Sequence, residues 1–475
     1  MDERKPRKTK IVCTIGPTSD SPEILEGLIH AGMNIARLNF SHGTQEEHLR
    51  KIETILQIMD RLKKPIAILQ DLSGPKIRVG KVKQGGVELR RGENFFLTNR
   101  QIVGDEKSVS VSYRSLPHEV RPGDTILLSD GTIELQVLGR NDQTIECRVV
   151  VGGVLTSHKG INFPTRSILA SAFTGKDHQD LLFGVKHGVD LVSLSYVREA
   201  ADIEEVKRVL EKEAANIPVI AKIERKEALD HIDEILLASD GIMVARGDLG
   251  VETPLERIPN VQKMLIQKAN ALGKPVITAT QMLRTMVDHK QPTRAEVTDV
   301  VNAIYDGTDA IMLSEETASG QFPLEAVRMM AKIALAAEEE FPFDKFLERE
   351  TDEKVDLPQA ISHAASFLAD KVKAVAIVTP TESGSTAQWV SRLRPRQPIL
   401  ALTRHLSTVK RLTLCWGVCP VPVPDWKDTD DMLMRAKRMP KEMGMASTGD
   451  KVVIIAGVPI SIPGTTHLIK VEIVE

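Results

Sequence analysis

Short apolar segments recur along the chain, each ending in polar residues and each followed by a segment with amphipathic helical character. The same alternation would suit an open doubly wound sheet, so the number of segments decides between the two architectures. Eight segments have strand length and are apolar almost throughout, which is typical of strands buried on both faces. We therefore predict an α/β protein built on a (β/α)8 TIM barrel. The eight predicted strands are Lys10–Gly16, Met33–Phe40, Pro65–Leu72, Asp190–Val197, Pro218–Glu224, Gly241–Asp248, Pro275–Met282 and Asp309–Thr317.

Helix signals lie between these apolar segments. The Ser-Pro-Glu sequence at 21–23 can open a helix that Gly32 closes, and Thr44 can cap a second helix with acidic residues in its first turn. A third helix is expected from near Pro254 to Gly273.

Two further regions differ from the barrel segments in composition and in the pattern of their apolar residues. Residues 78–165 are rich in glycine and in short alternating segments such as 125–128 and 144–149, which predict a small all-β domain inserted into a barrel loop. A separate α/β unit is expected from about Leu357, with a helix at 358–370 and another from Ser385. Its predicted strands lie at 374–379, 399–403, 451–456 and 467–474. The predicted domain boundaries are 1–72 with 166–340 for the barrel, 73–165 for the insert and 355–475 for the C-terminal unit.

The composition limits the classes of partner. The chain has 475 residues, so two to four domains are expected, and 42% hydrophobic with 27% charged residues is ordinary for a soluble globular protein. A net charge of −3 gives no basic field for nucleic acid, and no segment suits a membrane span, so neither partner is expected. Four cysteines predict no disulfide scaffold, and Cys415 with Cys419 lacks the second pair of a zinc site. With no signal-peptide pattern at the N-terminus, we expect a cytoplasmic protein.

Polar and ionisable residues gather at the predicted carboxyl ends of the strands, where (β/α)8 enzymes have their sites. They come from most of the strands: Arg37, Asn39, Ser41, His42, Asp71, Lys222, Glu224, Arg246, Gly247, Asp248, Thr280, Gln281, Ser314, Glu315 and Glu316.

Three of these residues predict a metal-assisted site. Glu224 and Asp248 end neighbouring strands, and two anions held together favour a shared divalent cation, Mg²⁺ or Mn²⁺ rather than zinc. Lys222 lies on the same strand face as Glu224 because side chains alternate with a period of two. It is therefore placed to neutralise a phosphoryl group. The alternative is that the acids cap helices or pair with basic residues while Lys222 extends to water.

A second cluster combines a cation with oxygen ligands. Arg37 could hold a phosphate, and the oxygens of Asn39, Ser41 and Asp71 could hold a small cation. Residues 244–250 cross from a strand to a helix start with small residues, which suits anion binding but is a weak signal. No P-loop or strand-linked dinucleotide motif is present. The residues alone support a metal-assisted enzyme acting on a small phosphorylated acid, without identifying the reaction.

Five segments in order along the chain resemble pyruvate kinases: 9–17, 33–43, 221–224, 243–250 and 278–283. The resemblance covers essentially the whole length. It implies a catalytic (β/α)8 barrel, an inserted β-barrel lid and a C-terminal α/β regulatory domain. It also implies phosphoryl transfer from phosphoenolpyruvate to ADP in glycolysis, giving pyruvate and ATP, with Mg²⁺ (or Mn²⁺), a homotetramer and a phosphorylated allosteric effector.

The resemblance assigns roles residue by residue. Catalytic positions are Lys222, Arg37 and Thr280, and Mg²⁺ positions are Glu224 and Asp248. Substrate positions are Arg37, Lys222, Gly247, Asp248 and Thr280. Nucleotide positions are Asn39, His42, Arg78 and Lys159, of which the last two lie on the insert. The enolate is expected to take its proton through water near Thr280, from a donor that the sequence leaves open.

One departure from the family concerns K⁺. Its matching positions are Asn39, Ser41, Asp71 and the carbonyl of Leu72. Members that require K⁺ generally have Thr in place of Leu72 and Glu in place of Lys76. We predict that the Lys76 ammonium replaces the charge of the ion, so that K⁺ is not required. The alternative is that Lys76 points to solvent and K⁺ still binds.

The turn at 379–386 is rich in hydroxyl groups and leads into a helix, which makes it a candidate phosphate nest. Residues 463–466 are a candidate to close over it. Glu382 stands where some fructose-bisphosphate-binding members have Lys, so that effector is less expected. The alternative is an ordinary capped helix. The predicted effector residues are Thr381, Ser383, Gly384, Ser385 and Thr386.

Two other functions fit part of the pattern. A magnesium-dependent lyase or mutase acting on phosphoenolpyruvate or a related 2-oxo acid would need no nucleotide lid, and Arg78 and Lys159 on the insert argue against it. A non-enzymatic sensor would be expected to lack Lys222 or a magnesium carboxylate, and the chain retains both.

Overall fold

The computed structural model describes residues 6–166, 168, 171–348, 356–457 and 466–475. The eight predicted strands form a closed parallel barrel in the order β1, β2, β3, β12, β13, β14, β15, β16, which confirms the predicted fold class. Each strand is shorter than predicted at one or both ends, because the predicted segments include flanking residues that lie outside the ladder. The barrel strands are β1 Lys10–Thr14, β2 Ile35–Asn39, β3 Ala67–Asp71, β12 Leu191–Leu194, β13 Val219–Ile223, β14 Gly241–Ala245, β15 Val276–Ala279 and β16 Ala310–Leu313.

The barrel helices begin where the sequence predicts them. α1 (Pro22–Ala31) is capped by Ser21 and ends at Gly32, and α2 (Gln45–Leu62) has a capping box formed by Thr44. The third predicted helix is α9 (Ile258–Ala271), which ends just before Gly273, and a short 3₁₀ turn, η1 (Leu255–Arg257), precedes it at the predicted start. The other barrel-region elements are α4 Gly175–His187, α5 Ala200–Lys212, α6 Lys226–Asp230, α7 Ile232–Ala238, α8 Arg246–Glu252, η2 Arg284–Val287, α10 Arg294–Asp306, α11 Glu315–Ala318, α12 Pro323–Glu339 and α13 Phe343–Leu347.

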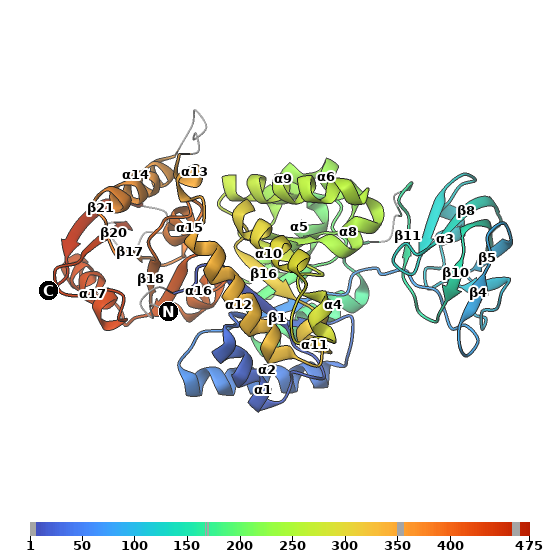
Figure 1. Cartoon of the computed structure of the whole chain (residues 1–475), viewed down its shortest axis with the longest axis horizontal. Helices are drawn as coiled ribbons and strands as arrows, with labels where there is room; N and C mark the ends of the chain where they lie inside the picture. Colours follow the sequence, from blue (N-terminus) through green and yellow to red (C-terminus); the bar gives the residue numbers. More distant parts are fainter. Residues whose placement is uncertain (1–5, 167, 169–170, 349–355, 458–465) are drawn as a thin grey trace.

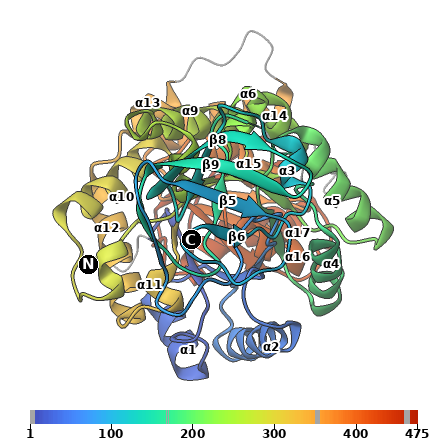
Figure 2. The ribbon, with the colours of Figure 1, turned by 90° about the vertical axis from the view of Figure 1, so that its right-hand side faces the viewer.

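The all-β insert has a hydrophobic core of its own, which includes Phe95 and Phe163. Its six-stranded sheet has the order β11, β7, β8, β9, β5, β6, and a two-stranded sheet pairs β10 with β4. Figure 2 views the molecule from this end, and the insert lies in front of the barrel. Its elements are β4 Val87–Leu89, β5 Asn94–Thr98, β6 Ser108–Ser110, α3 Leu116–Glu119, β7 Thr125–Leu128, β8 Ile133–Arg140, β9 Thr144–Val151, β10 Gly153–Leu155 and β11 Ile161–Asn162.

The C-terminal unit contains a five-stranded sheet in the order β19, β18, β17, β20, β21. The edge strand β19 was not predicted, because Pro420 and Pro422 interrupt its pattern; an edge position tolerates prolines since one side needs no ladder donor. The elements are α14 Leu357–Lys371, β17 Ala376–Pro380, α15 Ser385–Ser391, β18 Ile399–Thr403, α16 Leu406–Leu412, β19 Val418–Pro422, α17 Thr429–Glu442, β20 Lys451–Gly457 and β21 Thr466–Ile473.

The C-terminal unit docks on the amino ends of the barrel strands. The Arg394 guanidinium, 1% exposed, donates to Asp309 Oδ2 at 2.8 Å. The backbone N–H of Trp416 donates to Asp309 Oδ1 at 3.0 Å, and Lys410 pairs with Asp190 at 3.0 Å. The barrel therefore lies between the C-terminal unit and the insert, as Figure 1 shows. No helix in the described part of the chain is long and apolar enough to cross a membrane.

Candidate active site

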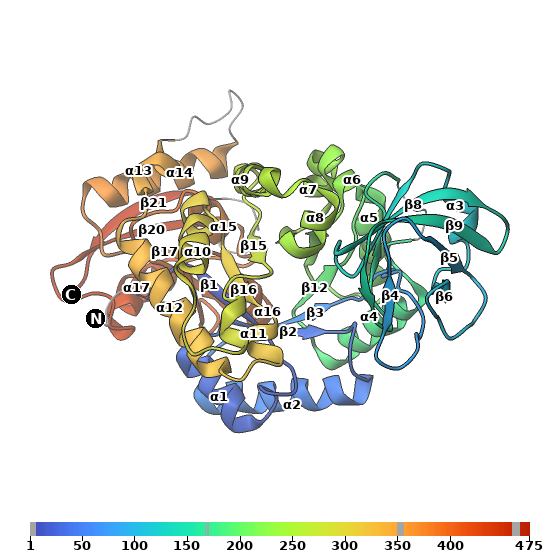
Figure 3. The ribbon, with the colours of Figure 1, turned by 45° about the vertical axis from the view of Figure 1, so that its right-hand side comes forward.

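The carboxyl end of the barrel faces the insert (Figure 3). Lys222, on β13, has a side chain that is only 9% exposed. Its Nζ donates to Ser195 Oγ at 2.7 Å and lies 3.1 Å from Glu224 Oε1 and 3.2 Å from Asp71 Oδ1. Burial opposes the charged form of Lys222, but Asp71 and Glu224 outweigh it and raise the pKa of the ammonium. Lys222 is therefore held as a cation at this rim.

Asp71 holds a second cation beside Lys222. Arg37, on β2, donates from Nε to Asp71 Oδ2 at 2.7 Å and from Nη1 to Thr14 Oγ1 at 2.8 Å. Asp71 Oδ1 also accepts a hydrogen bond from Ser193 Oγ at 2.7 Å. Burial disfavours the carboxylate, but the charges of Lys222 and Arg37 outweigh it and lower the pKa of Asp71. One buried acid thus fixes the positions of both cations.

Glu224 and Asp248 are close enough to repel each other. Glu224 Oε2 accepts a hydrogen bond from the Tyr196 backbone N–H at 2.8 Å. Burial raises the pKa of Glu224, Lys222 opposes this, and the charge of Asp248 adds to it. In the described residues no group of three or more His, Cys, Asp or Glu is arranged to hold a metal ion. The two carboxylates of Glu224 and Asp248 fit Mg²⁺ by their chemistry, because this ion is commonly bound by one or two carboxylates with water and substrate completing its shell.

Gly247 and Thr280 meet at van der Waals contact. A Cβ placed on Gly247 would lie 2.9 Å from Thr280 Cγ2, so only glycine fits here. Thr280 has a φ of 76°, a left-handed conformation that is strained for a β-branched residue. Arg246 holds this turn by donating from Nη2 to the Thr280 carbonyl at 2.8 Å, while its Nη1 pairs with Asp299 at 2.7 Å. The hydroxyl of Thr280 is thereby fixed beside the first turn of α8.

Lys76 points into the interface between the insert and the barrel rather than to bulk solvent. Its Nζ lies 3.4 Å from Asp248 Oδ1, and its side chain is 29% exposed. A Cβ on Gly160 of the insert would lie 3.4 Å from Lys76 Cε. The ammonium therefore sits against a carboxylate of the candidate metal site.

The positions that match the family's monovalent-cation site are already engaged in part. Asn39 Oδ1 accepts a hydrogen bond from the Ser41 backbone N–H at 3.1 Å. The Leu72 carbonyl accepts one from Ser195 Oγ at 2.7 Å, and Asp71 holds Arg37 and Lys222 as described above. Each of these three groups thus already accepts a hydrogen bond or an ion pair from the protein.

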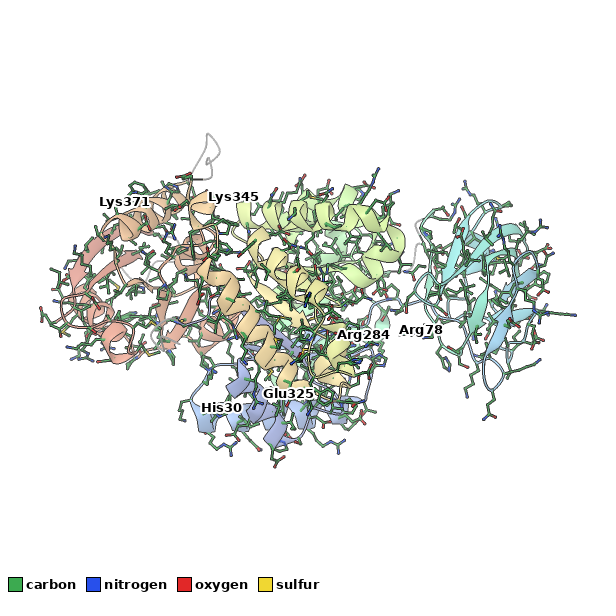
Figure 4. All side chains as sticks on the ribbon, viewed as in Figure 1. His30, Arg78, Arg284, Glu325, Lys345 and Lys371 are labelled. Carbon is green, nitrogen blue, oxygen red and sulfur yellow. The ribbon has the colours of Figure 1, made fainter. Side chains whose placement is uncertain are left out.

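The predicted nucleotide residues come from both the barrel and the insert. His42 follows β2, and burial lowers its pKa, with the charges of Arg78, Lys76 and Arg37 adding to the effect. Arg78 lies where the insert joins the barrel (Figure 4) and donates from Nη1 to the His158 carbonyl at 3.0 Å. Lys159 is exposed on the insert. The positive charges of Arg78, Lys76 and Arg37 therefore act together near His42, and this concentration of charge favours a polyanionic ligand.

The hydroxyl-rich turn of the C-terminal unit is internally bonded. Thr381 Oγ1 accepts a hydrogen bond from the Gly384 N–H at 2.9 Å, and the Ser383 and Ser385 hydroxyls are 3.1 Å apart. Of the predicted covering segment 463–466, residues 463–465 lie outside the described residues.

Two further contacts close this turn. The hydroxyls of Thr386 and Thr466 are 2.7 Å apart, which joins α15 to the start of β21. Glu382 accepts from Arg404 Nε at 2.9 Å, and its Oε2 lies 2.6 Å from His405 Nε2. The carboxylate that departs from the family pattern is therefore already paired with basic groups.

Ser193 and Ser195 were not singled out in the sequence, yet they orient Asp71 and Lys222. The sequence did contain a signal, namely two serines at alternate positions of an otherwise apolar strand segment. Alternate residues share one strand face, so both hydroxyl groups are expected on the same side. The anchoring role of Arg246 left no comparable signal, since its acceptors, the Thr280 carbonyl and the Asp299 carboxylate among them, come together only in the folded chain.

The fold and the geometry of this rim define a (β/α)8-barrel enzyme whose centre combines two buried cations with three carboxylates. Comparison with protein families narrows this class. The model for the pyruvate kinase barrel domain matches residues 6–327, and the model for the pyruvate kinase alpha/beta domain matches residues 359–472. The chain belongs to the pyruvate kinase family and is a phosphotransferase, which confirms the family assigned from its motifs.

Individual relatives agree with this assignment over nearly the full length. A pyruvate kinase from Clostridium acetobutylicum is 45% identical over 472 residues, which cover 99% of this chain and 100% of the relative. A pyruvate kinase from Staphylococcus aureus (strain MRSA252) is 46% identical over 471 residues, which cover 98% of this chain and 80% of the relative.

Proposed function

We propose that this protein transfers the phosphoryl group of phosphoenolpyruvate to ADP, giving pyruvate and ATP, with Mg²⁺ or Mn²⁺ as its cofactor. One observation carries the proposal. Lys222 and Glu224 lie 3.1 Å apart at the carboxyl end of the barrel, and Asp71 joins Lys222 to Arg37. This arrangement places two cations and a metal-binding acid around one small volume, as phosphoryl transfer requires.

In this proposal Arg37 binds the phosphoryl group and Lys222 stabilises its charge during transfer. Their side chains are held by Asp71 before substrate arrives, so little reorganisation is needed at the moment of reaction. Gly247, Asp248 and Thr280 receive the carboxylate end of phosphoenolpyruvate. Thr280 orders the water through which the enolate is protonated at carbon.

Glu224 and Asp248 would hold the divalent ion. When bound, Mg²⁺ supplies charge neutralisation and a template for the phosphoryl oxygens. The remaining positions of its shell are left to water and substrate, in keeping with two protein carboxylates.

The nucleotide would be held between the barrel and the insert. Asn39 and His42 contribute from the barrel, and Arg78 and Lys159 contribute from the insert. Closure of the insert over ADP would exclude water and align the attacking oxygen. We further propose that Lys76 makes added K⁺ unnecessary.

We also propose how the protein is regulated, how it assembles and where it acts. A phosphorylated metabolite would bind the turn formed by Thr381, Ser383, Gly384, Ser385 and Thr386. The protein would act in glycolysis in the cytoplasm as a homotetramer, with neither nucleic acid nor membrane as a partner.

Pyruvate release, measured with and without ADP, tests the central proposal. We expect phosphoenolpyruvate to be consumed only when ADP and Mg²⁺ are both present. The variant K222M should lose at least about 100-fold in kcat, the usual cost of removing a group that stabilises transition-state charge. The exposed residue Lys212 provides the control, and K212M should match the parent. Pyruvate release without ADP would support a lyase instead, and binding without turnover would support a sensor.

A further inference from the structure

The loop between β2 and α2 contains His42, which is proposed to contact the nucleotide together with Asn39 at the end of β2. The side chain of His42 is exposed, but its backbone carbonyl lies 2.9 Å from Nε2 of His48, a residue of α2 that is 3% exposed. A carbonyl oxygen can only accept a hydrogen bond, so Nε2 of His48 carries a proton and donates it. His48 therefore fixes the peptide plane that follows His42.

The imidazole of His48 is itself held in one orientation. It stacks on the ring of Phe40, with the ring centroids 4.0 Å apart and the ring planes at 12° to each other. Among the described residues its Nδ1 has no hydrogen-bond partner, and burial lowers the pKa of the ring, with the carbonyl of His42 opposing this effect. The ring is therefore neutral, and its one proton is on the nitrogen that faces the carbonyl.

A second side chain holds the same loop from another helix. Lys176, on α4, donates from Nζ to the Phe40 carbonyl at 2.8 Å and forms an ion pair with Asp180 of the same helix. Gln45, the first residue of α2, donates from Nε2 to Asp180 Oδ1 at 2.9 Å. Two carbonyls within residues 40–42 thus accept hydrogen bonds from side chains of two different helices. The backbone of this segment is ordered before any ligand binds, which lowers the cost of binding.

The cations proposed to bind the phosphoryl group are held separately from this loop. Arg37 and Lys222 are both fixed by the carboxylate of Asp71. The loop meets Asp71 at its backbone, where the Phe40 N–H donates to the carbonyl at 2.9 Å. Loosening the loop beyond Phe40 should therefore weaken nucleotide binding more than it weakens the binding of phosphoenolpyruvate.

We propose that His48 is a positioning residue for the nucleotide, which holds the loop at 39–43 in the conformation that presents Asn39 and His42 to the phosphates of ADP. The donated N–H carries this role, and the stacked ring places it. The inference rests on the proposed function, because that function assigns His42 to the nucleotide.

Three variants separate the donor from the ring. H48F keeps an aromatic ring against Phe40 but has no N–H, and H48L removes the donor with a side chain smaller than phenylalanine. H48Q restores a donor, because the glutamine amide can place an N–H near the position of Nε2. His187, on α4, provides the matched control H187F. It stacks on Phe183 at 4.5 Å, and Phe183 lies 6.1 Å from Phe40 in the same aromatic cluster.

Hydrogen–deuterium exchange of the enzyme without ligands measures the order of the loop. In H48F and H48L we expect the amides of residues 40–44 to exchange about three- to tenfold faster than in the parent, because the loop opens more often when one hydrogen bond is lost. H48Q and H187F should exchange as the parent does. Unchanged exchange in both donor-free variants would overturn the inference.

Calorimetric titration with ADP and Mg²⁺, in the absence of phosphoenolpyruvate, measures the effect on the nucleotide without turnover. H48F and H48L should raise Kd for ADP about three- to tenfold, the range expected for one lost hydrogen bond. H48Q should restore the parental Kd, and KM for phosphoenolpyruvate should stay within about twofold of the parent in all variants.

Faster exchange with an unchanged Kd for ADP would show that His48 only stabilises the fold, and would overturn the inference. A parent protein that binds ADP but makes no pyruvate would contradict the proposed function and leave the role of His48 intact. A parent that does not bind ADP would overturn both.

Discussion

Asp71 shows how one buried side chain can organise a site. It binds Arg37 and Lys222 at once, and its Oδ1 also accepts a hydrogen bond from Ser193. The sequence placed Lys222 and Glu224 on one strand face from their spacing alone, since alternation along a strand is local. It could not show that Asp71 joins Arg37 to Lys222, because that contact depends on the order of strands around the barrel.

We predict that Lys76 decides whether the enzyme requires a monovalent cation. We expect the parent enzyme to keep most of its activity when K⁺ is replaced by tetramethylammonium, because the Lys76 ammonium already lies 3.4 Å from Asp248. K76M should become dependent on an added cation or lose activity. The exposed residue Lys83 on the insert supplies the control, and K83M should behave as the parent. A parent that loses nearly all activity without K⁺ would contradict this prediction.

Glu252 should leave a signature in the pH dependence of stability. Burial raises its pKa from 4.5 to about 7, with Arg225 opposing this, Glu227 adding to it, and the Lys226 N–H and Asn162 lowering it. The folded protein therefore keeps a proton that the unfolded chain releases between these values. The stability from this group is fully present below about pH 4.5 and is lost as the pH rises through about 7.

E252Q removes this titration. At pH 8 we expect the variant to be more stable than the parent by about 2 kcal/mol, because the amide avoids burying a charge. The difference should shrink as the pH falls from 8 to 5, which chemical denaturation at several pH values can measure. A difference that stays constant with pH would show that Glu252 does not titrate in this range.

At the scale of elements, α8 carries Gly247 and Asp248 of the candidate site in its first turn, and its Val251 lies near Gly131 of the insert. G247A should raise KM for phosphoenolpyruvate by at least about tenfold, because the added methyl group would lie 2.9 Å from Thr280 Cγ2. G250A is the matched control on the same helix. Its Cβ would meet Leu255 Cδ2 at 3.5 Å and Ile258 Cγ1 at 3.9 Å, both ordinary contacts, and alanine should stabilise the helix by about 0.5–1 kcal/mol. Equal kinetics for the two variants would contradict the role given to Gly247.

The elements that were predicted well have strong local signals. The caps of α1 and α2 and the eight apolar strands are examples. Residues that are adjacent in sequence determine both helix capping and the burial of a strand on two faces. β19 was missed because its prolines contradict strand propensity, and only its place at the sheet edge makes them acceptable. The 3₁₀ turn η1 was read as helix for a similar reason, since Pro254 signals a helix start whichever form follows.

At the scale of the whole molecule, the C-terminal unit and the insert contact opposite ends of the barrel. Within one chain, a signal from the turn that we propose as the effector site to the proposed catalytic rim would therefore have to cross the barrel. Arg394 and Asp309 form the buried ion pair at the first of these interfaces.

R394M leaves Asp309 without its cation, and breaking a buried pair in this way costs about 3–5 kcal/mol. We expect calorimetry to resolve two unfolding transitions in place of a single cooperative one. R396M is the control, because Arg396 forms an exposed ion pair with Asp344. This variant should unfold as the parent does. A single transition at the parental temperature for R394M would mean that other contacts suffice to couple the two parts.

The insertion point of the all-β domain has a consequence for how the chain folds. β3 and β12 are neighbours in the barrel, yet the backbone N–H of Ile68 bonds an Asp190 that is 122 residues away in sequence. Bringing such distant segments together is entropically slow for a flexible chain. Because the insert has its own core, it can form first and deliver its two ends side by side, which shortens the search that ring closure of the barrel requires.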